Sequence, residues 1–206
     1  VLYHRDKEDR ESIANGIAGK RGATLVRPYD DPFVIAGQGT VGREIAEDMT
    51  ALGLAPDIVV APASGGGLIA GVATAVKAKF PQAQVIVAEP KDYDDHGLSL
   101  RAGHREAHHA AGRTICDALM AAMPGEMTFS INSKLLANGV AASDEEVGAA
   151  VAFAYRELKL VVEPGGAVGL AALLAGRIDA KGKNVVIVLS GGNVDAETFE
   201  KVLAEN

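Results

Sequence analysis

Two patterns of apolar residues alternate along the chain: short runs rich in β-branched residues and longer segments with helical spacing. Continuous β-branched runs are typical of strands buried in a parallel sheet, and they occupy 57–61, 84–88 and 184–189. Apolar residues three and four positions apart predict helices, which cover 40–52, 68–80, 143–160, 165–175 and 196–204. Because strand, turn and helix repeat in this order, the sequence predicts an α/β fold, an open and mostly parallel sheet with helices on both faces.

The remaining segments are less regular. Short apolar stretches at 1–4 and 23–26 are predicted as strands, and the segment 9–22 between them has helical spacing and ends on a glycine. Between 91 and 133 the pattern is too loose to predict a regular element. Ser143 followed by Glu146 forms a capping box, which predicts the start of the helix that continues to about residue 160.

Composition narrows the class of protein. The 206 residues suffice for one domain with a substantial core, and 48% apolar with 23% charged residues is ordinary for a globular protein. A net charge of −7 argues against a nucleic-acid partner, which needs clustered Lys and Arg. The chain has no signal peptide and no apolar run of about 18 residues, so no membrane partner is expected. The single cysteine, Cys116, excludes an internal disulfide and fits a reducing, cytoplasmic location.

The strongest chemical signal is the glycine-rich turn between the strand 57–61 and the helix 68–80. It consists of Ser64, three consecutive glycines and Leu68. Main-chain N–H groups of such a turn can converge on an anion, and the following helix N-terminus favours negative charge. The alternative is a tight turn without a ligand. The turn matches neither the Walker loop nor the dinucleotide pattern, so the sequence favours a single phosphate over a pyrophosphate.

Three further segments carry candidate chemistry at strand ends or helix starts. Ser190 and Gly191 follow the strand 184–189, where ligands bind in open α/β sheets, although a plain turn is equally compatible. The acidic segment 89–95 suits Mg²⁺, Mn²⁺ or Ca²⁺, although acidic loops are more often simply solvated. Glu163 precedes a Gly/Ala-rich helix and can also be read as ordinary helix-start chemistry.

Other polar and reactive residues are interpreted as structural. The histidines His104, His108 and His109 lack a cysteine or patterned carboxylate to complete a metal site, so a solvated polar helix face is the preferred interpretation. Cys116 has no neighbouring base and is expected to be a small buried residue.

Taken in order, several segments resemble the fold-type-II pyridoxal-phosphate (PLP) enzymes, and within them the group of serine racemases and threonine or serine dehydratases. These segments are IAGQGT at 35–40, the glycine loop at 62–71, AEP at 88–90, TICD at 114–117, VEP at 162–164 and LSGGNVD at 189–195. Six segments in family order make the resemblance specific. It covers essentially the whole chain and implies the large domain of the tryptophan-synthase-β-like PLP fold.

The resemblance also implies roles for individual residues. The implied cofactor-binding residues are Ser64, Gly65, Gly66, Gly67, Leu68, Glu163, Ser190 and Gly191. Among them, the loop would cradle the phosphate of pyridoxal 5′-phosphate and Ser190 would bind the pyridine nitrogen. A divalent cation (Mg²⁺, Mn²⁺ or Ca²⁺) would be bound by Glu89 and Asp95 together with the main-chain carbonyl of Tyr93.

The sequence departs from the family pattern in one important respect. The family's Schiff-base lysine lies in a Ser-Phe-Lys-like segment, and nothing in this sequence matches that segment. We therefore expect 1–206 to be the C-terminal portion of the large PLP-binding domain, with the lysine segment and the small domain upstream. On this interpretation no residue of this chain is the catalytic lysine, and the isolated fragment is inactive.

The resemblance implies a PLP-dependent ammonia-lyase, or dehydratase, that converts a β-hydroxy amino acid to a 2-oxo acid and ammonia. The expected substrate is threonine, serine or 3-hydroxyaspartate, and the expected assembly is a homodimer. A serine or aspartate racemase of the same family is the nearest alternative. An inactive domain that binds a phosphate ligand is the alternative from a different class.

Overall fold

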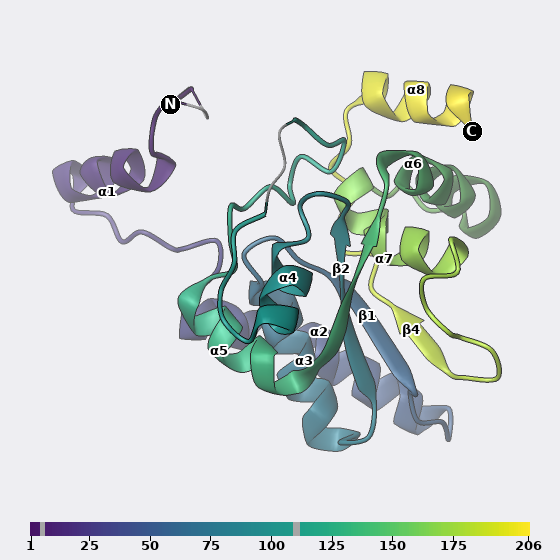
Figure 1. Cartoon of the computed structure of the whole chain (residues 1–206). Helices are drawn as coiled ribbons and strands as arrows, with labels where there is room; N and C mark the ends of the chain where they lie inside the picture. The colour runs from purple at the N-terminus through teal and green to yellow at the C-terminus, as the bar shows by residue number, and fades with distance from the viewer. Residues whose placement is uncertain (5–6, 109–111) are drawn as a thin grey trace.

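The computed structural model describes residues 1–4, 7–108 and 112–206. Within these ranges a four-stranded parallel sheet has the order β3-β2-β1-β4 (Figure 1). The strands are β1 (Ile58–Pro62), β2 (Gln84–Pro90), β3 (Leu136–Ala142) and β4 (Val185–Ile187). The predicted α/β fold with an open parallel sheet is therefore confirmed.

Helices cover both faces of the sheet. They are α1 (Arg10–Arg21), α2 (Pro32–Ala51), α3 (Gly67–Lys79), α4 (Asp95–Ala102), α5 (Glu126–Leu135), α6 (Asp144–Phe153), the π-helix η1 (Ala154–Leu158), α7 (Pro164–Leu174) and α8 (Ala196–Glu205). In Figure 1, α2, α3 and α5 lie on one side of the sheet, α6 and α7 lie on the other, and α1 stands apart from the body. None of the α1 residues is buried. Among the described residues, no helix is both long enough and apolar enough to cross a membrane.

Alternate residues of the central strands supply two separate cores. Val59 and Ala61 of β1 face the cluster that contains α3, whereas Ile58 and Val60 face the cluster that contains α6 and α7. This division follows from strand geometry, in which successive side chains point to opposite faces. Both faces of β1 are thus buried, which explains why its sequence is a continuous apolar run rather than an alternating one.

The structure corrects several predicted elements. The stretches 1–4 and 23–26 are not strands, because they have no pairing partner among the described residues and most of their side chains are exposed. The helix predicted over 40–52 begins at Pro32, after Asp31 caps it by accepting the main-chain N–H groups of Phe33 and Val34. The strand predicted over 184–189 is regular only over Val185–Ile187.

Three elements were absent from the predictions: α4, α5 and β3. Helix α4 lies within the segment 91–133 and α5 begins within it, where the sequence pattern was too loose to predict a regular element. The strand β3 reads LANGVAA, which lacks strong strand formers, and its pairing with β2 holds it in place. The helix predicted over 143–160 is α6 followed by η1, and its Ser143–Glu146 capping box is confirmed.

Helices α2 and α3 pack at close range because glycines remove side chains from their contact. A methyl group added to Gly71 would lie 2.5 Å from the main-chain nitrogen of Gly39 and 2.5 Å from the carbonyl oxygen of Ile35. Neither main-chain atom can move without displacing α2. Gly71 therefore fixes how closely α3, and with it the turn that precedes α3, approaches α2.

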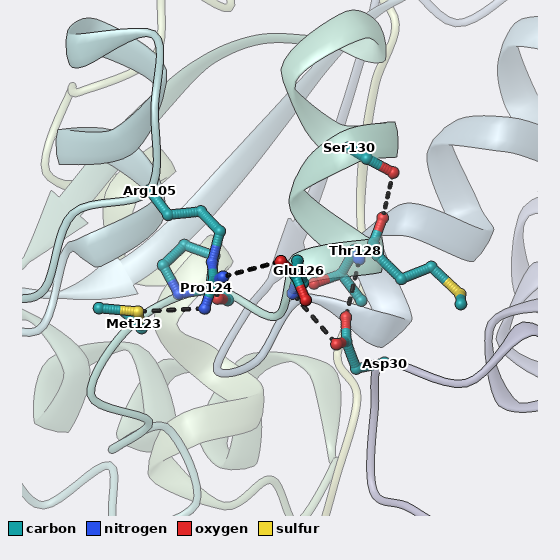
Figure 2. A network of polar contacts seen from close by, with 8 residues as sticks. Asp30, Arg105, Met123, Pro124, Glu126, Thr128 and Ser130 are labelled. Carbon is teal, nitrogen blue, oxygen red and sulfur yellow. Dashed lines mark hydrogen bonds and ion pairs between the residues drawn. The ribbon is translucent and has the colours of Figure 1, made fainter.

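Helix α5 is fastened at its N-terminus by a residue from a distant part of the chain. Asp30 accepts the main-chain N–H of Glu126 at 3.1 Å and that of Thr128 at 3.0 Å, and so supplies the cap that Gly125 cannot provide (Figure 2). Arg105 donates to the carbonyl of Pro124 at 2.9 Å and holds the preceding segment. Asp30 itself has a left-handed backbone conformation, with φ of 60°.

The replacement Gly71→Ala is expected to lower the free energy of unfolding by about 1 to 3 kcal/mol, because the methyl group forces the two helices apart. Gly37→Ala is the matched control, since it lies on α2 with open space around it. That replacement should stabilise the protein by about 0.5 to 1 kcal/mol. Chemical denaturation of the intact protein followed by circular dichroism measures both, and equal effects of the two would refute the close-packing argument.

Loss of the Asp30 cap is expected to destabilise the start of α5. Asp30→Ala should lower the free energy of unfolding by about 1 to 2 kcal/mol, because two main-chain N–H groups lose their acceptor. Asp30→Asn keeps one acceptor oxygen and tolerates the left-handed backbone, so its loss should be smaller. Denaturant midpoints of the three proteins give the order, and an Asn variant as weak as the Ala variant would contradict the capping role.

Candidate functional site

The carboxyl ends of β1 and β4 open onto one cavity of about 500 Å³. The glycine loop after β1 and Ser190 after β4 both line it, so the structure brings together the two segments proposed for the phosphate and the ring nitrogen. The loop residues in its lining are Ser64, Gly65, Gly66, Gly67 and Leu68. Adjacent parallel strands end at the same edge of a sheet, which is where open α/β folds bind ligands.

The glycine loop leads directly into the N-terminus of α3. Gly66 is the residue before the helix, with φ of 93°, and no side chain in the described part of the protein caps the helix there. A methyl group added to Gly66 would lie 2.5 Å from the His96 ring and 2.9 Å from Asn132. Both the backbone conformation and the space therefore require glycine, and the first N–H groups of α3 are left available to an anion.

Three buried polar side chains hold the carbonyl groups on the inner side of the loop. The bonds are from His96 Nε2 to the Ser64 oxygen at 3.1 Å, from Thr128 Oγ1 to the Gly65 oxygen at 2.6 Å, and from Asn132 Nδ2 to the Gly66 oxygen at 3.4 Å. All three side chains belong to residues without exposed surface. Since the N–H and C=O of a peptide group point in opposite directions, fixing the carbonyls inward turns N–H groups outward.

The protonation state of His96 follows from this contact. A carbonyl oxygen only accepts, so Nε2 of His96 carries the proton and Nδ1 does not. Burial lowers the pKa of His96 to about 4, which keeps the ring neutral near pH 7. No described residue pairs with Nδ1.

An aromatic ring packs on the loop from the other side. A methyl group added to Gly65 would lie 2.3 Å from the ring atoms of Tyr29, and one added to Gly67 would lie 3.2 Å from the Tyr29 Cβ atom. Tyr29 lines the cavity, and its burial raises its pKa. No sequence pattern singles out Tyr29. The only signals are its place beside Asp30 and the scarcity of aromatic residues in the chain.

Glu163 and Gly191 lie next to Ser190 but do not belong to the described lining of the cavity themselves. The main-chain N–H of Glu163 donates to the Gly191 carbonyl at 3.0 Å, and its carboxylate accepts the main-chain N–H of Asn193 at 2.9 Å. A methyl group on Gly191 would lie 2.3 Å from this carboxylate. Glu163 therefore shapes the turn that carries Ser190.

A second cluster lies at the end of β2, where two carboxylates are buried side by side. Glu89 has no exposed surface and accepts the main-chain N–H groups of His96 at 2.8 Å and Gly97 at 2.9 Å. Asp95 is 1% exposed, and its Oδ2 atom has no hydrogen-bond partner among the described residues. Burial and the neighbouring charge of Asp95 raise the pKa of Glu89 well above its usual range, and burial raises the pKa of Asp95 to about 7.

No ion pair between a described basic side chain and Glu89 or Asp95 neutralises this carboxylate pair. Arg101 bonds to Asp94 at 3.4 Å, on the outer side of the segment. Tyr93 is buried nearby and donates its hydroxyl to the Gly112 carbonyl. The described residues contain no group of three or more His, Cys, Asp and Glu side chains that could hold a metal. A cation site here would thus depend on two carboxylates and a main-chain oxygen.

The sequence also singles out the histidines that follow α4 and the single cysteine, Cys116. His104 forms an exposed pair with Glu106 at 2.7 Å, and His108 packs against the Tyr93 ring with centroids 4.4 Å apart. Since α4 ends at Ala102, the interpretation of a polar helix face was wrong for these two, and His109 lies outside the described residues. Cys116 is buried as expected, and burial raises its pKa to about 12.

None of the described lysines lines the 500 Å³ cavity. A larger, mostly aliphatic groove of about 1120 Å³ runs along α2 and α3, and it contains none of the cofactor-binding or cation-binding residues proposed from the sequence. Size alone therefore does not mark the site. The polar cavity at the sheet edge contains the loop, the ring-nitrogen candidate and the helix N-terminus.

Comparison with known proteins agrees with this geometry. A family model described as pyridoxal-phosphate dependent enzyme matches residues 1–191. The L-threonine ammonia-lyase of Thermotoga maritima is 40% identical over 91% of this chain and 45% of its own length. The serine racemase of Schizosaccharomyces pombe is 36% identical over 100% of this chain and 62% of its own length.

A solved structure, that of the T.th. threonine deaminase, superposes with a TM-score of 0.85 at 40% identity, covering 91% of this chain and 63% of that one. The chain spans about half to three fifths of the length of the curated relatives that it matches. From the fold, the loop and these matches together, the chain belongs to the family of pyridoxal-phosphate dependent enzymes.

Proposed function

We propose that the intact protein is a PLP-dependent ammonia-lyase that eliminates the β-hydroxyl group of a β-hydroxy amino acid as water. Hydrolysis of the resulting imine takes up one water again and releases ammonia and a 2-oxo acid. The observation that supports this most is the loop with inward carbonyls at the N-terminus of α3, opposite Ser190 in one cavity. Threonine, serine and 3-hydroxyaspartate are the proposed substrates. The threonine ammonia-lyase and threonine deaminase relatives favour threonine among them.

The residues of the cavity fit the cofactor at both of its polar ends. The N–H groups of the loop and of the first turn of α3 would bind the phosphate. Ser190 would donate or accept a hydrogen bond at the ring nitrogen, and a hydroxyl, unlike a carboxylate, does not hold a proton there. Glu163 orients Ser190 by fixing the turn 191–193. When bound, PLP supplies an electron sink that stabilises negative charge at the substrate Cα atom.

The proposed lysine partner of the cofactor lies outside 1–206, because none of the described lysines lines the cavity. On this proposal the chain is the C-terminal portion of the large domain, and this portion alone is inactive. The family resemblance supports a homodimer, and one buried cysteine fits the cytoplasm. A racemase is the second candidate, and the serine racemase relative, matched over the full chain, supports it.

The intact protein with bound PLP should show an absorbance band at about 410 to 420 nm. Addition of threonine should change this band and release a 2-oxo acid. Gly66→Ala should weaken PLP binding by more than tenfold, because the methyl group collides with His96 and distorts the loop. Gly103→Ala is the matched control, since its φ of 77° carries a similar backbone penalty in open space. It should lose stability but keep its PLP affinity.

The same assay separates the two candidate activities. Chiral analysis of the remaining amino acid reports racemisation, and 2-oxo acid detection reports elimination. Exclusive formation of the opposite enantiomer would replace the lyase by the racemase. A wild-type protein that binds PLP no better than Gly66→Ala would refute the proposed cofactor site.

We also propose that Glu89 and Asp95 bind Mg²⁺, Mn²⁺ or Ca²⁺ with the main-chain carbonyl of Tyr93. Two buried carboxylates side by side, one of them with an unpaired oxygen, fit a hard divalent cation. Such a cation would neutralise both charges, and it would share the site with the two N–H groups that already bind Glu89.

Addition of Mn²⁺ should raise the thermal midpoint of the intact protein and EDTA should lower it, since binding at about 100 times Kd adds about 2.7 kcal/mol. Asp95→Asn should abolish this response, because it removes the carboxylate with the unpaired oxygen. Asp92→Asn is the control, since Asp92 is an exposed carboxylate of the same segment and its charge does not act on the pair. A full response in Asp95→Asn would place the cation elsewhere.

A further inference from the structure

One residue, His96, contacts both the carboxylate pair and the glycine loop. Its main-chain N–H donates to Glu89 Oε1 at 2.8 Å, and its ring Nε2 donates to the Ser64 carbonyl at 3.1 Å. It has no exposed surface, so neither bond competes freely with water. Two candidate ligand sites at the ends of neighbouring strands are thus joined through one side chain.

The main-chain N–H of His96 is fixed by Glu89, one member of the carboxylate pair. Helix α4 begins at Asp95, so His96 and Gly97 supply the next two N–H groups of its first turn. Asp94, the residue before the helix, makes no capping bond with its side chain, and Glu89 of β2 caps the helix instead. Any change in the distance between Glu89 and Asp95 therefore moves the first turn of α4, and His96 with it.

The ring side of His96 is in direct contact with the loop. The position that a Cβ atom of Gly66 would take is 2.5 Å from His96 Cε1 and 2.7 Å from Nε2, so the ring lies immediately beneath the loop backbone. The carbonyls of Gly65 and Gly66 are held by Thr128 and Asn132 of α5, whose N-terminus Asp30 anchors. Only the Ser64 carbonyl is held by a residue, His96, that is itself bonded to Glu89 of the carboxylate pair.

We infer that His96 is a positioning residue that couples a cation on Glu89 and Asp95 to the phosphate-binding geometry of the loop. With the cation bound, attraction to both carboxylates draws Asp95 toward Glu89 and sets the first turn of α4. The His96 ring then holds the Ser64 carbonyl inward and the loop N–H groups face the phosphate. Without it nothing draws the two carboxylates together, and this hold loosens. The inference rests on the proposed function, which places the PLP phosphate on this loop.

Coupling of this kind is reciprocal: a cation that strengthens PLP binding must itself be bound more tightly when PLP is present. The test measures PLP dissociation constants of the intact protein by absorbance titration in EDTA and in saturating Mn²⁺. Mn²⁺ binding is measured separately by electron paramagnetic resonance. The quantity of interest is the ratio of the two PLP constants, which does not require turnover.

In the wild type, Mn²⁺ should strengthen PLP binding by about fivefold or more. In His96→Leu the ratio should fall to about one while Mn²⁺ still binds, because the contact to Ser64 is lost and both carboxylates remain. His96→Gln should restore most of the ratio, since its amide nitrogen takes the place of Nε2. Asn132→Ala is the matched control: it removes the side-chain bond to the Gly66 carbonyl, which keeps the main-chain bond from Ala70. PLP should then bind more weakly, but the ratio should stay that of the wild type.

Several results would overturn the coupling role of His96. An unchanged ratio in His96→Leu would overturn the inference, as would loss of Mn²⁺ binding in that variant, which would make His96 part of the cation site itself. If the wild type binds PLP equally well in EDTA and in Mn²⁺, the coupling is refuted but the proposed function is not. A wild type that binds no PLP rejects the proposed function as well. If His96→Leu does not fold, His96→Asn replaces it, because an asparagine amide is too short to reach the Ser64 oxygen.

Discussion

The direction of three carbonyl groups at positions 64–66 determines what the site can bind. A buried carbonyl needs a donor, and each of the three accepts from a side chain 32 to 66 residues away in sequence. The carbonyls of Gly65 and Gly66 also accept main-chain N–H groups, from Gly125 and Ala70. A turn made of a serine and glycines has few side chains of its own to fix its shape. Its geometry is imposed from beneath by α4 and α5, and the N–H groups that would meet a phosphate are set by residues that never touch it.

That arrangement depends on how the supporting helices are held. Helix α5 is fixed at its start by Asp30, which lies next to Tyr29, so the segment that packs on top of the loop also anchors the helix beneath it. Helix α3, which presents its N-terminus to the cavity, is set against α2 by the absence of a side chain at Gly71. Glycine permits close approach on one side of the site, and buried polar bonds fix the loop on the other.

The sequence was sufficient where a segment's structure follows from its own residues. Continuous apolar runs identified β1 and β2, and three adjacent glycines identified the turn that leads into α3. The sequence failed where long-range contacts decide the structure. Strand β3 forms because β2 pairs with it, whereas 23–26 is equally apolar and stays irregular for want of a partner among the described residues. His96 was overlooked because a lone histidine after four acidic residues resembles a solvated loop, and burial is not visible in a sequence.

The magnitudes at the start of α4 show why the carboxylate pair cannot be a purely structural cap. A carboxylate at a helix N-terminus gains about 0.3 to 1 kcal/mol, and up to about 2 in a partly buried position. Removing each carboxylate from water costs several kcal/mol. Glu89 recovers part of this cost through two N–H bonds, but Asp95 adds a second charge with one oxygen unpaired. The helix terminus is too weak to balance both, so a proton or a cation must neutralise the pair. A cation that spans both carboxylates would fix the first turn of α4, and His96 with it, more firmly than a proton on one of them.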